Sequence, residues 1–220
     1  MQELVYARLR EDILTGRLGP GQWVRQDAIA REMQISKIPI REALRRLEAD
    51  GYVTFEPNRG ARVTNLSVEE LQELYVERAA LEAFAAHLAV PLMVDADVKA
   101  LKKSLLLQER LQKQGNIQSL STTTREFHFI IYRRTGRERL CSKIGRLWDN
   151  CGRYQRAYLH LPDGVFRTID GHAAMVDACQ NHDARALEAA VRDHIVSISH
   201  GVEVALSGGG SHPAVLPPSG

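Results

Sequence analysis

Cysteine is scarce in this chain, and its spacing excludes several kinds of site. The sequence has three cysteines, Cys141, Cys151 and Cys179, an odd number without a CxxC pair. A disulfide framework or a cysteine-based zinc ribbon requires paired cysteines at characteristic spacings. We therefore expect reduced, mostly packed thiols, as in a cytoplasmic protein.

Long apolar stretches are also missing. The sequence contains no run of about 18 apolar residues, the length that a membrane-spanning helix requires. The stretch MQELVYARLREDILTG at the N-terminus carries acids and no unbroken apolar segment, unlike a signal peptide. The sequence therefore predicts no membrane association, and its 44% of hydrophobic residues predicts a sizeable core.

Neither sign of charge dominates the whole chain, but bases gather locally. The net charge is +2; residues 1–66 hold 11 Lys/Arg and 9 Asp/Glu, and the remaining residues hold 18 of each. Between residues 36 and 46 only one acid stands among four bases: Lys37, Arg41, Arg45 and Arg46. A local basic face of this kind suits a polyanionic partner, although a solvated helix surface would look the same.

The first third of the chain has the periodicity of a small mixed domain. We expect helices over 2–15, 26–33 and 36–50 and short strands over 52–57 and 61–66. Ser36 and Pro39 mark the start of the third helix, and Gly51 marks its end. This order predicts a winged helix-turn-helix domain over residues 1–66, whose third helix enters the DNA major groove with a basic stripe: Lys37, Arg41 and Arg45.

The rest of the chain shows no strand signal. Six amphipathic segments, over 67–89, 94–114, 116–135, 137–160, 165–181 and 183–206, predict an antiparallel six-helix bundle. The expected fold class is therefore mainly α, with an all-helical domain over residues 67–206. Residues 207–220 are rich in Gly, Ser and Pro, and we expect a disordered tail.

Three motifs occur within residues 6–63: the run LGPGQ, the block IREALRRLEADG and the wing RGARV. With these motifs the segment resembles the DNA-binding domain of the GntR family of bacterial transcription regulators. The resemblance implies a bacterial, nucleoid-associated protein that binds a double-stranded, pseudo-palindromic operator as a homodimer. The implied DNA contacts are Ser36, Lys37, Pro39, Arg41, Arg45, Arg59 and Gly60.

Three histidines interrupt apolar stripes of the predicted bundle: His128, His172 and His194. The turn between the last two helices centres near residue 182, so that His172 and His194 lie at similar heights of an antiparallel hairpin. Three converging imidazoles are a plausible metal site with open positions. Neutral core histidines bonded to carbonyl groups are the alternative.

The segment ELYVERAALEAFAAHLA resembles the FadR subfamily, whose C-terminal helical domain binds an effector and dimerises. Its metal-binding members carry an Asp four residues before the first histidine, where this chain has Thr124. A neutral hydroxyl is a poor ligand, so three histidines favour Zn²⁺ or Ni²⁺ over Mg²⁺ or Mn²⁺. Arg78, on an apolar stripe, needs an anion: the subfamily implies an effector carboxylate, and a structural ion pair is the alternative. Thr124 and Arg153 are further candidate effector contacts.

These features favour a transcription regulator that is not an enzyme, and more specifically a repressor released by a small carboxylate. A metal-dependent hydrolase using the three histidines is one alternative. A constitutive DNA-binding dimer with a purely structural bundle is the other.

Overall fold

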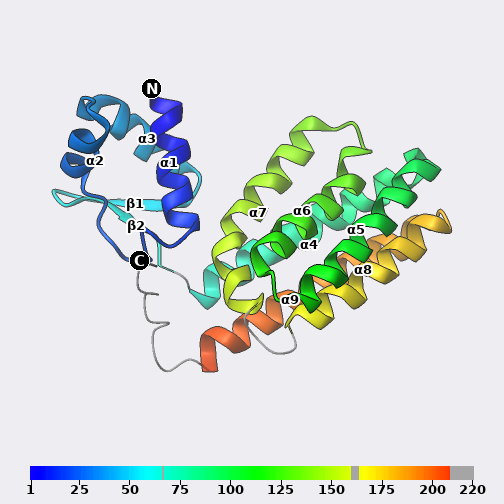
Figure 1. The fold of residues 1–220 in the computed structure, drawn as a ribbon. Helices are drawn as coiled ribbons and strands as arrows, with labels where there is room; N and C mark the ends of the chain where they lie inside the picture. The colour runs from blue at the N-terminus through cyan, green and yellow to red at the C-terminus, as the bar shows by residue number, and fades with distance from the viewer. Residues whose placement is uncertain (66, 160–163, 209–220) are drawn as a thin grey trace. The chain divides into compact units, whose positions relative to one another are not determined.

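The computed structural model describes residues 1–65, 67–159 and 164–208, without the side chains of 153–168, 170 and 205–208. The described chain divides into two compact units, Met1–Ser67 and Val68–Gly208 (Figure 1). It is mainly helical, with one two-stranded sheet, which confirms the predicted fold class. Among the described residues, no helix combines the length and the apolar character that crossing a membrane would require.

The first unit consists of three helices and a hairpin: α1 (Gln2–Leu14), α2 (Gln26–Met33), α3 (Lys37–Ala49), β1 (Val53–Glu56) and β2 (Gly60–Val63). Helix α1 packs against α3, and buried aliphatic side chains from both, among them Leu9 and Leu44, form one core with the hairpin. Burying these side chains stabilises the unit, because a short helix is not stable alone in water.

Residues with positive φ angles make the turns of the first unit. Helix α2 ends at Gln34, which is left-handed, and α3 ends before Gly51, where φ is +80°. The wing turns at Asn58 (φ +61°) and Gly60 (φ +96°), which pairs β1 antiparallel to β2. Ser36 is at the N-cap position of α3 as expected, but its side chain makes no capping hydrogen bond.

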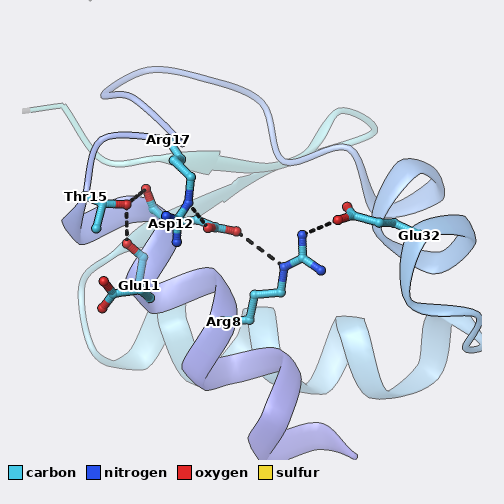
Figure 2. A network of polar contacts seen from close by, with 6 residues as sticks. All are labelled: Arg8, Glu11, Asp12, Thr15, Arg17 and Glu32. Atoms are coloured by element: carbon cyan, nitrogen blue, oxygen red, sulfur yellow. Dashed lines mark hydrogen bonds and ion pairs between the residues drawn. The ribbon is translucent and has the colours of Figure 1, made fainter. Parts of the chain in front are cut away.

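A polar network on the surface links α1 to α2 (Figure 2). Arg8 lies 2.5 Å from Glu32 on α2 and 3.7 Å from Asp12, which also binds Arg17 at 2.5 Å. Solvent screens these pairs, and each is expected to contribute at most about 1 kcal/mol to folding. The network therefore adds little to stability, and of these pairs only Arg8–Glu32 joins α1 to α2.

The second unit contains six α-helices and a short 3-10 turn, η1 (Val90–Leu92). The helices are α4 (Val68–Ala89), α5 (Asp95–Lys113), α6 (Ile117–Arg133), α7 (Glu138–Leu159), α8 (Gly164–Gln180) and α9 (Ala184–Gly208). Helix α4 packs on α9 and α7, α8 packs on α9 and α5, and α5 packs on α6. Helix α9 extends through Gly208, two residues into the predicted tail of residues 207–220. The rest of that predicted tail lies outside the described residues.

The core of the second unit is not purely apolar. Two of its three free cysteines, Cys151 and Cys179, are buried, as expected for packed thiols. It also encloses polar side chains from most of its helices: Arg78, Glu82, Gln108, Thr124, His128, His172 and His194. Buried polar groups on this scale must satisfy one another, so their contacts define the candidate site.

Candidate DNA-binding face and metal centre

Most of the expected DNA-contacting residues of α3 are exposed. Lys37, Arg41 and Arg45 are exposed, as is Ser36, and Pro39 is half-buried. The Lys37 ammonium pairs with Asp27 of α2 at 2.5 Å. Within the part of the chain that the structure describes, Arg41 and Arg45 have no ion pair within 4.0 Å. Both guanidinium groups are therefore available to an external anion.

The remaining base of this segment points elsewhere. Arg46 forms an ion pair with Glu3 of α1, and its guanidinium lies 4.0 Å from the centre of the Tyr6 ring. It belongs to the α1–α3 contact and not to the basic stripe. On the wing, Arg59 is exposed and lies 3.7 Å from Glu56, and Gly60 follows it at the turn.

The three histidines of the helical unit converge. His128 comes from α6, His172 from α8 and His194 from α9, and one nitrogen of each lies within 4.8 Å of the others. Their ring centres are 4.7–5.2 Å apart, and all three side chains are buried. The hairpin register of α8 and α9 thus brings His172 and His194 together, as the sequence spacing indicated.

Hydrogen bonds set which nitrogen of two of these rings carries the proton. Tyr132 donates its hydroxyl hydrogen to Glu82 at 2.8 Å, so its oxygen accepts from His128 Nδ1 at 3.1 Å. The amide oxygen of Gln108 lies 2.7 Å from His172 Nδ1 and accepts in the same way. Each Nε2 then carries a lone pair, and the two Nε2 atoms face each other at 3.1 Å.

Two facing lone pairs repel each other unless a cation or a proton lies between them. The donor set consists of neutral imidazole nitrogens, which suit borderline transition ions such as Zn²⁺ and Ni²⁺. The residues present therefore fit a metal ion. The Thr124 hydroxyl is buried and hydrogen-bonded to Gln108 at 3.3 Å.

A buried carboxylate lies at the opposite side of His128. Glu82 accepts from Arg78 Nε at 2.6 Å, from the Tyr132 hydroxyl at 2.8 Å and from the indole nitrogen of Trp148 at 2.9 Å. Arg78 and Glu82 are both fully buried, and they are four residues apart on α4. These bonds compensate the desolvation of the carboxylate.

Arg78 thus forms an ion pair with Glu82, which was the alternative to an effector carboxylate in the sequence analysis. Burial alone would lower the pKa of Arg78, but the Glu82 carboxylate raises it overall, so the side chain stays charged. Its Nη1 atom nevertheless has no hydrogen-bond partner among the described residues. The guanidinium also lies 4.2 Å from the centre of the Trp148 ring. The ion pair therefore leaves one buried donor unused.

A glycine sets how closely α8 approaches His194. A Cβ atom at Gly171 would lie 2.5 Å from His194 Nδ1, a distance that no side-chain carbon tolerates. The His194 ring therefore packs directly on the backbone of α8. This contact positions the third imidazole against the other two.

Burial keeps the three imidazoles neutral. It lowers the pKa of His128 and His172 well below the ordinary value, and the neighbouring histidines lower both further. Burial and the charge of Arg78 lower the pKa of His194 to about 3. Neutral imidazole is the form that binds a metal ion, so no proton needs to leave at neutral pH.

The sequence analysis missed four polar side chains of this network: Glu82, Gln108, Tyr132 and Trp148. Glu82 follows Arg78 by four residues, and Tyr132 follows His128 by four, so helical spacing was an available signal. The side chain of Arg153, a predicted effector contact on α7, lies outside the described residues.

The chain resembles known proteins over both units. Residues 1–63 match the gntR family of bacterial regulatory proteins, and residues 73–197 match the FCD domain. The chain is 28% identical over 144 residues to the HTH-type transcriptional regulator McbR of Escherichia coli. It is 30% identical over 110 residues to YdhC of Bacillus subtilis, an uncharacterized HTH-type transcriptional regulator.

These alignments are partial. They span 66% of this chain and 65% of McbR, and 50% of this chain and 49% of YdhC. The solved structure of E. coli McbR/YncC has the same fold, with a TM-score of 0.74 over 90% of this chain and 96% of that chain. The sequence identity in that comparison is 22%.

The metal-free protein should lose stability as the pH falls below about 6.5. Below this pH the histidines bind protons in the unfolded state but not in the folded state. Each such histidine lowers the free energy of unfolding by up to about 1.4 kcal/mol per pH unit. His194→Gln should flatten this dependence down to about pH 3. Urea unfolding of chelator-treated protein at several pH values measures the effect; the same pH dependence in wild type and His194→Gln would contradict it.

Proposed function

This chain belongs to the GntR family of bacterial regulatory proteins and carries an FCD domain, and on that premise we propose that it is a ligand-responsive repressor of transcription. A small organic acid releases it from its operator. The observation that carries the proposal is the combination of two parts. One unit presents unpaired arginines on a recognition helix, and the other buries three convergent histidines near an arginine with an unused donor.

DNA binding is assigned to α3 and the wing. Arg41 and Arg45 reach base edges or phosphates in the major groove, and Arg59 reaches the adjacent backbone. Lys37 must exchange its Asp27 partner for a phosphate, since its ammonium is occupied in the free protein. Two recognition helices of a homodimer read a pseudo-palindromic site.

The homodimer uses a groove between α4 and α9. This groove, about 510 Å³ in volume, is lined by the exposed apolar side chains Val76 and Val196 and by the charged Arg192 and Glu203. The two charges lie eleven residues apart on α9. A two-fold axis between them would place each Arg192 beside Glu203 of a second copy, so the surface is complementary to itself.

The three histidines hold a divalent ion, Zn²⁺ or Ni²⁺, in the buried centre. A bound ion would supply a positive charge with open coordination positions, which attracts an anionic ligand. The unused Nη1 donor of Arg78 takes part of the effector carboxylate. Thr124 and Arg153 are the further effector contacts of this proposal. Tighter packing of the helices around the ligand then changes the affinity for DNA.

A hydrolase is the weaker assignment for the same three histidines. Hydrolysis needs a general base that can reach the metal-bound water. Glu82, a fully buried carboxylate of this core, is already bonded to Arg78, Tyr132 and Trp148. The two relatives compared are named as transcriptional regulators. A constitutive dimer with a structural bundle would not need so many buried polar groups.

Replacing either exposed arginine of α3 should weaken operator binding. Arg41→Ala and Arg45→Ala should each lose about 1–3 kcal/mol if the contact is to a base. Arg133→Ala, which removes an equal charge from an exposed site on α6, is the matched control. Binding to DNA selected from a random pool, titrated at several salt concentrations, measures the effect. If the α3 variants and the control bind alike, the assignment of α3 to the groove is wrong.

Arg78 should be tested together with its partner. Arg78→Met alone would leave Glu82 buried without a countercharge, at a cost of about 3–5 kcal/mol. The double variant Arg78→Met/Glu82→Gln removes both buried charges together, so it should fold and bind DNA but lose its release by small carboxylates. A screen of acids that release wild-type protein from DNA provides the assay. A normal response of the double variant would exclude Arg78 as the effector anchor.

The metal content of the protein is directly measurable. Protein purified without chelators or a metal-affinity step should contain a divalent transition ion in elemental analysis. His172→Ala and His194→Ala should lose the ion and the effector response and retain DNA binding. If the wild type contains no ion, and added Zn²⁺ or Ni²⁺ leaves its melting temperature unchanged, the histidines are core residues only.

A further inference from the structure

Gln108 is a fully buried amide in the C-terminal half of α5, and it is not one of the three candidate metal ligands. Its side chain has no exposed surface, and its polar atoms have three partners. Its Oε1 atom lies 2.7 Å from His172 Nδ1 and 3.3 Å from the Thr124 hydroxyl, and its Nε2 atom lies 3.4 Å from Ser104. A buried amide is costly unless it is bonded in this way, so its position is well defined.

The amide is placed behind the histidine and not inside the metal centre. His172 directs Nε2 toward His128 at 3.1 Å and Nδ1 toward Gln108. The two nitrogens of an imidazole point to different sides of the ring. An oxygen bonded to Nδ1 therefore cannot bind an ion held at Nε2, but it can fix the ring orientation and the tautomer.

Thr124 acts on the same amide. Its hydroxyl donates to Gln108 Oε1, and Ser104 accepts from Nε2, which together hold the oxygen toward His172. With the amide turned over, Nε2 would face His172 Nδ1, and the imidazole would have to carry its proton on Nε2. That proton would occupy the lone pair needed for an ion.

We propose that Gln108 is the positioning residue of His172 in the metal centre and that Thr124 acts through it, orienting the amide and not coordinating the ion. This inference rests on the proposed metal site. It explains how a chain with Thr124 in place of a carboxylate keeps His172 ready to bind. The affinity of the centre for Zn²⁺ or Ni²⁺ is then set on α5, by a residue outside the coordination shell.

The experiment compares metal affinity in four variants. Gln108→Leu keeps the volume and removes the acceptor, and it should weaken Zn²⁺ and Ni²⁺ binding about 10–100-fold. Gln108→Glu keeps an acceptor and should bind at least as tightly as wild type. Thr124→Val should weaken binding in wild type but cause no further loss in the Gln108→Leu background. A full additional loss in that background would show that Thr124 is a ligand itself and overturn its assigned role.

A second measurement works without any metal. Side-chain ¹⁵N–¹H correlation spectra of chelator-treated protein should show His172 protonated on Nδ1 in wild type and in Gln108→Glu. In Gln108→Leu the spectra should show two neutral tautomers of His172 that exchange with each other. His172→Gln identifies the signal. If the wild type binds neither ion, the metal assignment fails, and these spectra still decide the role of Gln108. A mixed tautomer in the wild type, or unchanged spectra and metal affinity in Gln108→Leu, would overturn it.

Discussion

The carboxylate of Glu82 is the group on which the interior of the helical unit depends. An ionised carboxylate without solvent contact is tolerated only when donors surround it. Here the donors come from three helices: Arg78 on α4, Tyr132 on α6 and Trp148 on α7. Helix α4 cannot turn about its own axis without breaking the two bonds that Glu82 accepts from other helices, those from Tyr132 and Trp148. The carboxylate thus fixes the orientation of α4 relative to α6 and α7.

The order imposed by Glu82 continues through the core as a chain of hydrogen bonds. Because Tyr132 donates to Glu82, it can only accept from His128, and this fixes the lone pair that His128 directs at His172. From the other side, Gln108 has the same effect on His172. Five of the six helices, α4 to α8, are therefore joined by polar contacts with defined donor and acceptor roles. Apolar packing alone would not specify one arrangement so sharply.

The elements that repeat a simple period could be predicted from the sequence. Helical spacing located the six long helices, and strand alternation with the Asn58–Gly60 turn located the hairpin. The apolar surroundings of the three histidines and the register of the last two helices were sufficient to predict that the histidines converge. The spacing of Lys37, Arg41 and Arg45 predicted the basic stripe, but the count of four bases between residues 36 and 46 could not show that Arg46 contacts α1.

The supporting contacts could not be predicted in the same way. Gln108 and Thr124 are sixteen residues apart on different helices, and only the rotation of α5 against α6 brings them within hydrogen-bonding distance. Trp148 on α7 resembles any aromatic core residue until its indole nitrogen is placed beside Glu82. Such contacts depend on the rotation angle of each helix about its axis. A hydrophobic pattern shows which face of a helix is buried, but it does not define that angle closely enough.

Because Gly171 has no side chain, the spacing between α8 and α9 depends on His194. Between most packed helices the spacing is kept by aliphatic side chains, which can exchange rotamers at small cost. Here a flat, rigid ring, that of His194, lies against bare backbone of α8. Because no Cβ atom separates the ring from that backbone, His194 cannot turn far about its side-chain bonds unless α8 and α9 move apart.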